Sequence, residues 1–191
     1  MDRVADFLFE VGILKRTPRS GWAFLGSGAE SVADHTFRAA VIALVLARLD
    51  SDADVDRTVR LALLHDLPEA RTGDLNYVHQ RYVVADEERA AADQRDGLPI
   101  ADELAEASAE YAAGRTREAV LAHDADQLEM LLSLKERRDA GASAADDWIP
   151  FVLERLRTDV ARDLARTILD RRSDAWWFDR DSDWWSGRRR R

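Results

Sequence analysis

The sequence feature that most restricts the fold is an apolar segment with helical spacing, containing Val59, Leu61 and Leu64, that ends in His65 and Asp66. A carboxylate removed from water is stable only when it is paired, hydrogen-bonded or coordinated to a cation. The fold must therefore bring compensating groups to the end of this helix. An adjacent imidazole and carboxylate favour a metal ion as that compensation.

Further ligands of the same kind lie far away in the sequence. His35 and Asp126 are each flanked by residues with helical apolar spacing. Taken alone, His35 is more commonly explained as a hydrogen-bonded core histidine, and Asp66 as a helix-end residue. Together, two imidazoles and two carboxylates form a plausible shell for one divalent cation, made of His35, His65, Asp66 and Asp126.

Composition limits the possible partners. The chain has 191 residues, which is enough for one domain with a real core. The formal net charge of −9 argues against nucleic acid, because phosphate backbones are bound by clustered lysine and arginine. A small anionic substrate stays possible where a metal and local arginines reverse the field. The absence of cysteine excludes thiolate metal sites and leaves histidine and carboxylate ligands.

No segment is typical of a membrane span or a signal peptide. The longest unbroken apolar run, Ala39–Ala47, is far shorter than the roughly 20 residues that a membrane helix needs. The N-terminus, Met1-Asp2-Arg3, lacks a basic region followed by an apolar core. We therefore expect a soluble, cytoplasmic protein without membrane contact.

The apolar periodicity is helical almost throughout, which predicts an all-α fold. Ser31 is a good N-cap for a helix that reaches Leu49 and is apolar nearly all round, so we expect this helix to be central. Pro68 lacks a backbone donor, so the helix containing Leu61 should end near Asp66, with Pro68 in the first turn of a short new helix. Further helices are expected over residues 4–14, 80–113 (two, interrupted at Gly97-Leu98-Pro99), 117–138 and 146–171.

A lone histidine, then a His-Asp pair, then a distant aspartate is the hallmark of the HD-domain phosphohydrolase superfamily, which this chain resembles. Its segments most closely resemble the 5′-deoxynucleotidases of the HD domain-containing protein 2 type. The matching segments are Arg19–Trp22, Glu30–His35, Leu64–Asp66 with Glu69 and Gly73-Asp74, and Asp126–Met130. The resemblance implies an HD-domain helical bundle. We assign residues 1–172 to this domain and residues 173–191 to a C-terminal tail rich in tryptophan and arginine.

The resemblance implies that His35, His65, Asp66 and Asp126 bind one divalent metal ion. The donor chemistry agrees, because two neutral imidazoles and two carboxylates balance a dication and leave positions for water and a phosphate oxygen. Mixed nitrogen and oxygen ligands suit manganese, cobalt, iron, nickel or zinc better than calcium. The family is typically active with cobalt or manganese.

The resemblance also implies catalytic roles for Glu69 and Asp74. Glu69 matches a glutamate that handles the proton transfers, and Asp74 matches a carboxylate near the sugar and the reacting centre. Each has a structural alternative. Glu69 would also suit the first turn of a helix, where the dipole favours an acid, and Asp74 would suit a turn after Gly73.

Two further residues are expected to contact the substrate. Trp22 resembles a tryptophan that stacks on the base, an interaction that tolerates every base because each has a π-face. Arg19 is the candidate phosphate clamp. Ordinary packing for Trp22 and a solvated loop cation for Arg19 are the alternatives.

With these residues in place, the resemblance implies a metal-dependent phosphomonoesterase that converts 2′-deoxynucleoside 5′-monophosphates to deoxynucleosides and phosphate, and we expect it to be a homodimer. One alternative is another HD phosphohydrolase, acting on a phosphodiester, a nucleoside triphosphate or an alarmone. Small size and the absence of an obvious extra basic region argue against it. The other alternative is a non-catalytic nucleotide-binding interaction protein. Glu69 argues against that, because a structural metal needs no free acid beside it.

Two features lie outside the resemblance. His123 is three residues before Asp126 and hence near the same helix face, which leaves a supporting role open. The tail has four tryptophans and four terminal arginines, and we expect it to pack on the bundle or on a partner chain rather than bind nucleic acid. These residues are Trp176, Trp177, Trp184, Trp185 and Arg188 to Arg191.

Overall fold

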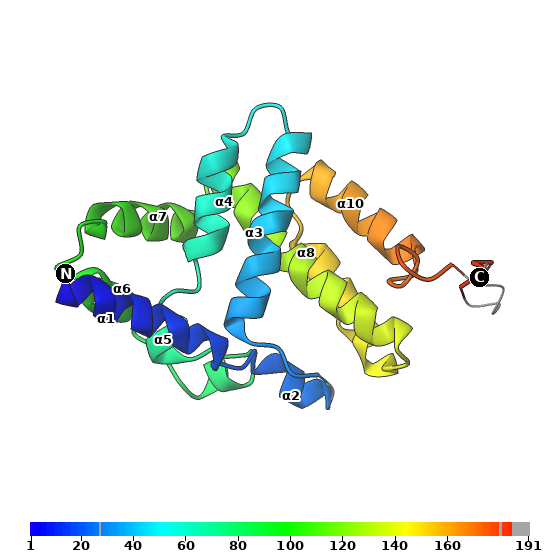
Figure 1. Ribbon diagram of the computed structural model, residues 1–191, viewed down its shortest axis with the longest axis horizontal. Coiled ribbons are helices and arrows are strands. Elements are labelled where there is room, and N and C mark those ends of the chain that lie inside the picture. The colour runs from blue at the N-terminus through cyan, green and yellow to red at the C-terminus, as the bar shows by residue number, and fades with distance from the viewer. Residues whose placement is uncertain (27, 180, 185–191) are drawn as a thin grey trace.

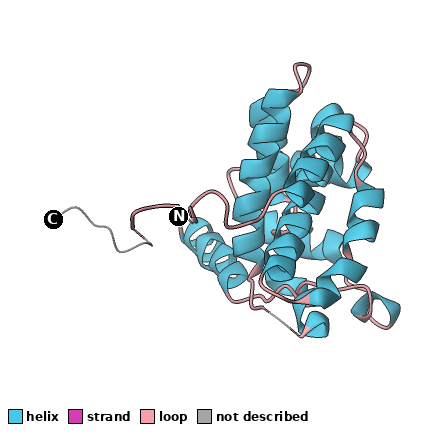
Figure 2. Cartoon of the chain, turned by 90° about the vertical axis from the view of Figure 1, so that its right-hand side faces the viewer, coloured by secondary structure: helices cyan, strands magenta, loops and turns pink. Residues whose placement is uncertain are grey.

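The computed structural model describes residues 1–26, 28–179 and 181–184. Every regular element of this part of the chain is a helix, which confirms the all-α prediction (Figures 1 and 2). The α-helices are α1 (Asp2–Val11), α2 (Gly21–Leu25), α3 (Val32–Leu49), α4 (Val55–Leu64), α5 (Glu69–Thr72), α6 (Glu87–Arg95), α7 (Ala101–Ala113), α8 (Arg117–Asp139), α9 (Ile149–Arg155) and α10 (Asp159–Asp170). Three short 3₁₀ segments are η1 (Gly12–Lys15), η2 (His79–Arg81) and η3 (Ser143–Asp147).

The centre of the bundle is made by α3, α4 and α8, which pack against one another (Figure 1). Leu46 of α3, Leu61 of α4 and Leu128 of α8 are almost fully buried and belong to one core. Helices α9 and α10 cover α8 and extend this core. Burial of such leucines is worth about 2 kcal/mol each, so packing rather than helix propensity holds the three central helices together.

Helix α3 begins as predicted, but only part of its surface is covered. Ser31 accepts a hydrogen bond from the backbone of Asp34, and the Asp34 carboxylate accepts one from the Ser31 backbone, which completes a capping box. Phe37, Val41 and Leu44 are 71%, 46% and 44% exposed. Helix α3 is central, as expected, because α4 and α8 both pack on it, but the face that carries these three residues is exposed.

The predicted helix over residues 146–171 is instead two helices. The chain is extended at Leu156, and α10 starts with Thr158 as its N-cap. Asp124 of α8 is fully buried and accepts hydrogen bonds from the backbone N–H of Arg157 (2.8 Å), the backbone N–H of Thr158 (2.9 Å) and the Thr158 hydroxyl (2.6 Å). These bonds replace the helical ones that the break removes, so one buried carboxylate fixes the turn.

The chain breaks near Pro68 as expected. Helix α4 ends at Leu64, and Pro68 stands immediately before the single turn of α5. Between them, Leu67 is buried in a second small core with Phe7, Leu14, Val32 and Leu98. This anchor fixes the segment that carries His65 and Asp66 between the two cores.

The segment after α10 leaves the helices (Figure 2). Trp176, Trp177 and Trp184 are 84%, 55% and 59% exposed, so more than half of the surface of each residue is open to solvent. Trp185 and Arg188 to Arg191 lie outside the described residues. Among the described residues, no helix is both long enough and apolar enough to cross a bilayer.

Candidate metal centre

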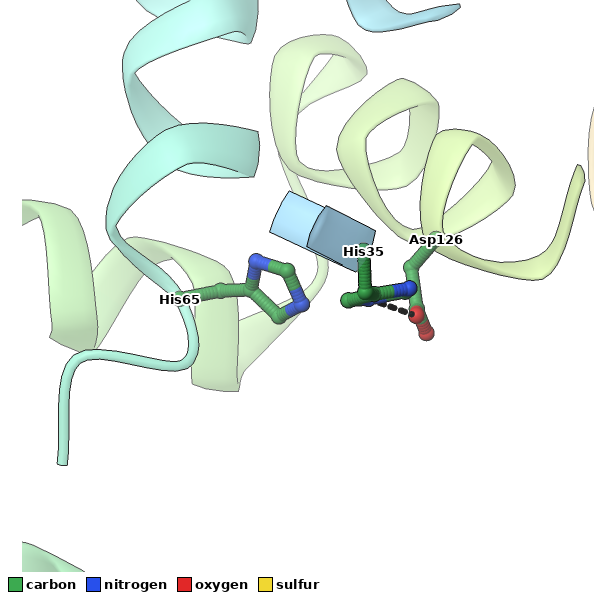
Figure 3. A group of neighbouring side chains, drawn as sticks. All are labelled: His35, His65 and Asp126. Atoms are coloured by element: carbon green, nitrogen blue, oxygen red, sulfur yellow. Dashed lines mark ion pairs between the residues drawn. The ribbon is translucent and has the colours of Figure 1, made fainter. Parts of the chain in front are cut away.

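Side chains from three separate parts of the chain meet in the middle of the bundle. Figure 3 shows His35 of α3, His65 at the end of α4 and Asp126 of α8 pointing toward a common region. One ligand atom from each lies within 4.8 Å of the others. Asp66 adjoins them, with its carboxylate 3.5 Å from His35 Nε2 and 3.1 Å from His65 Nε2. The structure therefore brings all four sequence-predicted ligands together.

Both imidazoles are held at Nδ1, which turns Nε2 toward the centre. His65 Nδ1 lies 2.8 Å from the carbonyl oxygen of Ala62, and a carbonyl only accepts, so the proton of this pair is on Nδ1. His35 Nδ1 lies 2.5 Å from the carboxylate of Glu129. Each ring can then present its Nε2 lone pair to a cation.

The protein groups alone leave polar atoms unpaired at this point. Nε2 of His35, Oδ2 of Asp66 and Oε2 of Glu69 are buried without a hydrogen-bond partner. Although His35 Nε2 is 3.1 Å from Oδ1 of Asp126, the two atoms are not aligned for a hydrogen bond. Buried polar atoms without partners are costly, and a cation between them would satisfy them. The residues therefore fit a divalent metal.

Electrostatics at the site also favour positive charge. Burial alone would lower the pKa of His35, but the carboxylates of Asp126 and Glu129 raise it to about 10. Burial alone would raise the pKa of Asp126, but His35, His65 and Arg19 hold it well below its usual range. The carboxylates therefore favour positive charge at this point, either as a proton on the imidazole of His35 or as a bound cation.

Glu69 lines a cavity of about 1210 Å³, which His65, Asp66 and Asp126 also line. Burial, followed by the nearby charges of Asp66 and Asp74, raises the pKa of Glu69 to about 9. A carboxyl group with a raised pKa beside a cation site is suited to proton transfer, because it can hold the proton near neutral pH.

Arg19 lies among these acids rather than in solvent. Its Nη1 is 3.7 Å from Oδ2 of Asp66 and 4.0 Å from Oδ1 of Asp74, and its side chain is 14% exposed. These carboxylates and Asp126 raise its pKa, although burial opposes this. A guanidinium in this position adds a fixed positive charge to the cavity wall beside the candidate metal ligands.

The loops around Arg19 and Asp74 are tied to each other. Asp74 accepts a 2.6 Å hydrogen bond from the backbone N–H of Ser20, and Ser20 Oγ accepts from the Asn76 amide at 3.0 Å. Gly73 turns the chain sharply after α5 with φ of 72°, a conformation that favours glycine. Asp74 therefore also holds the Arg19 loop in place.

Trp22 is more enclosed than its predicted stacking role suggests. It is 3% exposed, the Arg137 guanidinium lies 3.7 Å from its ring centroid, and the Trp148 ring stacks on it at 6.4 Å. Trp148 is half-buried and also lines the cavity. A base that enters the cavity would meet Trp148 as the more accessible ring of the pair.

Sequence reasoning assigned no role to Glu129, Tyr111 or Trp148. Tyr111 packs between two histidines, with ring centroids 4.9 Å from His65 and 4.0 Å from His123. His123 Nε2 also lies 2.9 Å from the carbonyl oxygen of Tyr111. A signal existed only for Glu129, which stands three residues after Asp126 and so faces the same way on α8.

Comparison with known proteins agrees with this geometry. Residues 11–168 match the sequence profile of the HD domain family. A bovine (Bos taurus) 5′-deoxynucleotidase HDDC2 is 40% identical over 140 residues, covering 70% of this chain and 67% of the relative. A conserved hypothetical protein from Pyrococcus furiosus has a structure with a TM-score of 0.73 and 36% identity, covering 86% of this chain and 96% of that one. A protein from Magnetospirillum magnetotacticum MS-1, described as a "predicted metal-dependent phosphohydrolase", has a TM-score of 0.69 and 26% identity, covering 88% of this chain and 90% of that one.

Proposed function

This chain belongs to the HD domain family and is a phosphohydrolase, and we propose that it hydrolyses 2′-deoxynucleoside 5′-monophosphates to deoxynucleosides and phosphate. The observation that carries the proposal is one cavity lined by His65, Asp66 and Asp126, with His35 in contact with them, and by the partly buried Glu69 and Arg19. Similarity to 5′-deoxynucleotidases supports the choice of substrate.

The proposed cofactor is one divalent ion, held by His35, His65, Asp66 and Asp126. Two carboxylates balance its charge, and the mixed donors suit cobalt or manganese, with zinc, iron and nickel as chemically acceptable alternatives. When bound, such an ion acidifies a water and polarises a phosphoryl oxygen. These are the two demands of phosphate-monoester hydrolysis, which is among the slowest uncatalysed reactions.

The protein supplies the proton and the charge compensation. Water adds to phosphorus while the bond from phosphorus to the 5′ oxygen breaks, so the leaving oxygen needs a proton. Glu69 is proposed to deliver that proton or to take one from the attacking water. Arg19 is proposed to neutralise the phosphate oxygens, because a guanidinium binds them with two parallel hydrogen bonds.

The sugar is proposed to lie beside Asp74, and the base beside the tryptophans of the cavity lining. Asp74 is fixed by the Ser20 backbone and adjoins Arg19, which suits a carboxylate that contacts the deoxyribose. Trp22 and Trp148 together supply an aromatic surface for the base. Since stacking tolerates base identity, we expect several bases to be accepted.

A substrate panel tests the reaction class. We expect the protein with added Mn²⁺ or Co²⁺ to release inorganic phosphate from deoxynucleoside monophosphates faster than from ribonucleoside monophosphates, and to leave deoxynucleoside triphosphates intact. The same protein with excess chelator is the control and should release none. Cleavage of triphosphates with monophosphates untouched would instead favour a triphosphate hydrolase.

We also infer a homodimer. The exposed apolar face of α3, formed by Phe37, Val41 and Leu44, is the kind of surface that a second copy covers. Sedimentation equilibrium should give twice the chain mass of 21.6 kDa. Val41→Glu should lower the mass to that of one chain, and a single-chain mass for the unaltered protein would contradict the inference.

A further inference from the structure

Glu129 is a buried carboxylate for which the proposed reaction has no use. Its side chain is 1% exposed, and it lies one helical turn after Asp126 on α8. A buried carboxylate is stable only with close partners, so its contacts indicate what it does.

Both oxygens of Glu129 are occupied. Oε2 lies 2.5 Å from Nδ1 of His35. Oε1 accepts hydrogen bonds from Arg38 Nε at 2.9 Å and Arg38 Nη2 at 2.6 Å, and from the Ser133 hydroxyl at 3.1 Å. The guanidinium therefore compensates the charge and fixes the carboxylate plane, and the remaining oxygen is aimed at one imidazole nitrogen.

A second cation site made of Glu30, His35 and Glu129 is the main alternative, because their ligand atoms lie within 4.8 Å of one another. Two arginines already pair with the carboxylates of this second site. Arg38 is bonded to Glu129, and Nη2 of Arg137 lies 3.5 Å from Oε2 of Glu30. A cation at this second site would also bind Nδ1 of His35. The imidazole proton would then have to be on Nε2, the nitrogen that faces Asp126. The contacts therefore favour a hydrogen bond over a second metal.

We propose that Glu129 is a positioning residue, which accepts the Nδ1 proton of His35 and so holds the Nε2 lone pair toward His65, Asp66 and Asp126. This inference rests on the proposed metal-dependent function. One turn of α8 then supplies a ligand, Asp126, and also the residue that orients a ligand on α3. Such outer partners typically change metal affinity by about 10- to 100-fold.

Glu129→Gln is a sharp test because it keeps the shape. Arg38 only donates, so it should hold the amide oxygen and turn the amide nitrogen toward His35. The amide then donates to Nδ1, and the imidazole proton moves to Nε2, where it blocks coordination. Chelator competition should show Co²⁺ binding about 10- to 100-fold weaker than in the unaltered protein. At saturating Co²⁺, the visible spectrum should change in the direction of one fewer nitrogen ligand.

The matched control is Glu136→Gln. Glu136 also binds Arg38, at 2.7 Å from Nη1, but its side chain is 50% exposed and it does not contact His35. The Glu136→Gln variant should bind Co²⁺ like the unaltered protein and give the same spectrum. Thermal unfolding of the Glu129 and Glu136 variants separates a loss of stability from a loss of metal affinity. Glu129→Asp, which keeps the charge but shortens the reach, gives the same test if the glutamine variant does not fold.

The outcomes separate the two proposals. Weaker Co²⁺ binding and an altered spectrum only in the Glu129 variants support the positioning role. Equal affinities and spectra in all variants overturn it while leaving the metal site intact. If the unaltered protein itself binds no Co²⁺, the proposed function fails, and the positioning role fails with it.

Discussion

Asp126→Ala should abolish measurable phosphate release and weaken Mn²⁺ or Co²⁺ binding by more than about 100-fold, because loss of even an outer partner of a ligand costs about 10- to 100-fold. Asp126 contributes one of the two carboxylates that would balance the dication, and its Oδ1 lies 3.1 Å from Nε2 of His35. Metal affinity by chelator competition and phosphate release from deoxynucleoside monophosphates check this expectation.

The control for that variant is an exposed aspartate. Asp163 lies on α10 and does not line the cavity, and its side chain is 66% exposed. Asp163→Ala should leave both metal affinity and turnover unchanged. If Asp126→Ala kept the affinity and activity of the Asp163 variant, Asp126 would not be a ligand.

The second large effect is expected from Glu69→Gln. An amide keeps the shape but cannot exchange the proton, so kcat should fall by about 10²- to 10⁴-fold, the usual contribution of general acid–base catalysis. Metal affinity and nucleotide binding should stay near those of the unaltered protein, since Glu69 is not among the proposed ligands. Steady-state kinetics and isothermal titration with a deoxynucleoside monophosphate measure the two quantities.

Glu103→Gln on α7 is the comparison for Glu69, because Glu103 is exposed and does not line the cavity. It should behave like the unaltered protein. Unchanged turnover in Glu69→Gln would remove its catalytic assignment and return Glu69 to the role of a first-turn helix acid. A joint loss of metal binding and turnover would instead make Glu69 a ligand.

The sequence predicted the parts of the fold that depend on local chemistry. Ser31 caps α3 because its hydroxyl reaches an N–H three residues on, and Pro68 separates α4 from α5 because it has no N–H to continue a helix. His65 and Asp66 could be predicted to need partners because their burial cost follows from residue type. The structure places His35 and Asp126 where those partners are needed.

What the sequence missed depends on contacts between distant residues. The break at Leu156–Thr158 is fixed by Asp124, which is 34 positions before Thr158, and the apolar period continues across it. Thr158 followed by Asp159 is an N-cap signal, but periodicity alone concealed it. The pairing of Glu129 with His35 spans 94 positions and depends on side-chain direction. The exposed face of α3 has the same composition as a buried one, so hydropathy could not separate them.

The central claim is that one divalent ion is held between α3, the end of α4 and α8. A crystal structure of the protein soaked with Mn²⁺ or Co²⁺, with anomalous diffraction recorded at the absorption edge of that metal, tests it most directly. The account predicts one strong anomalous peak about 2.0–2.3 Å from Nε2 of His35, Nε2 of His65 and an oxygen each of Asp66 and Asp126. A peak bound instead by Glu30 and Glu129, or no peak at saturating metal, would contradict it.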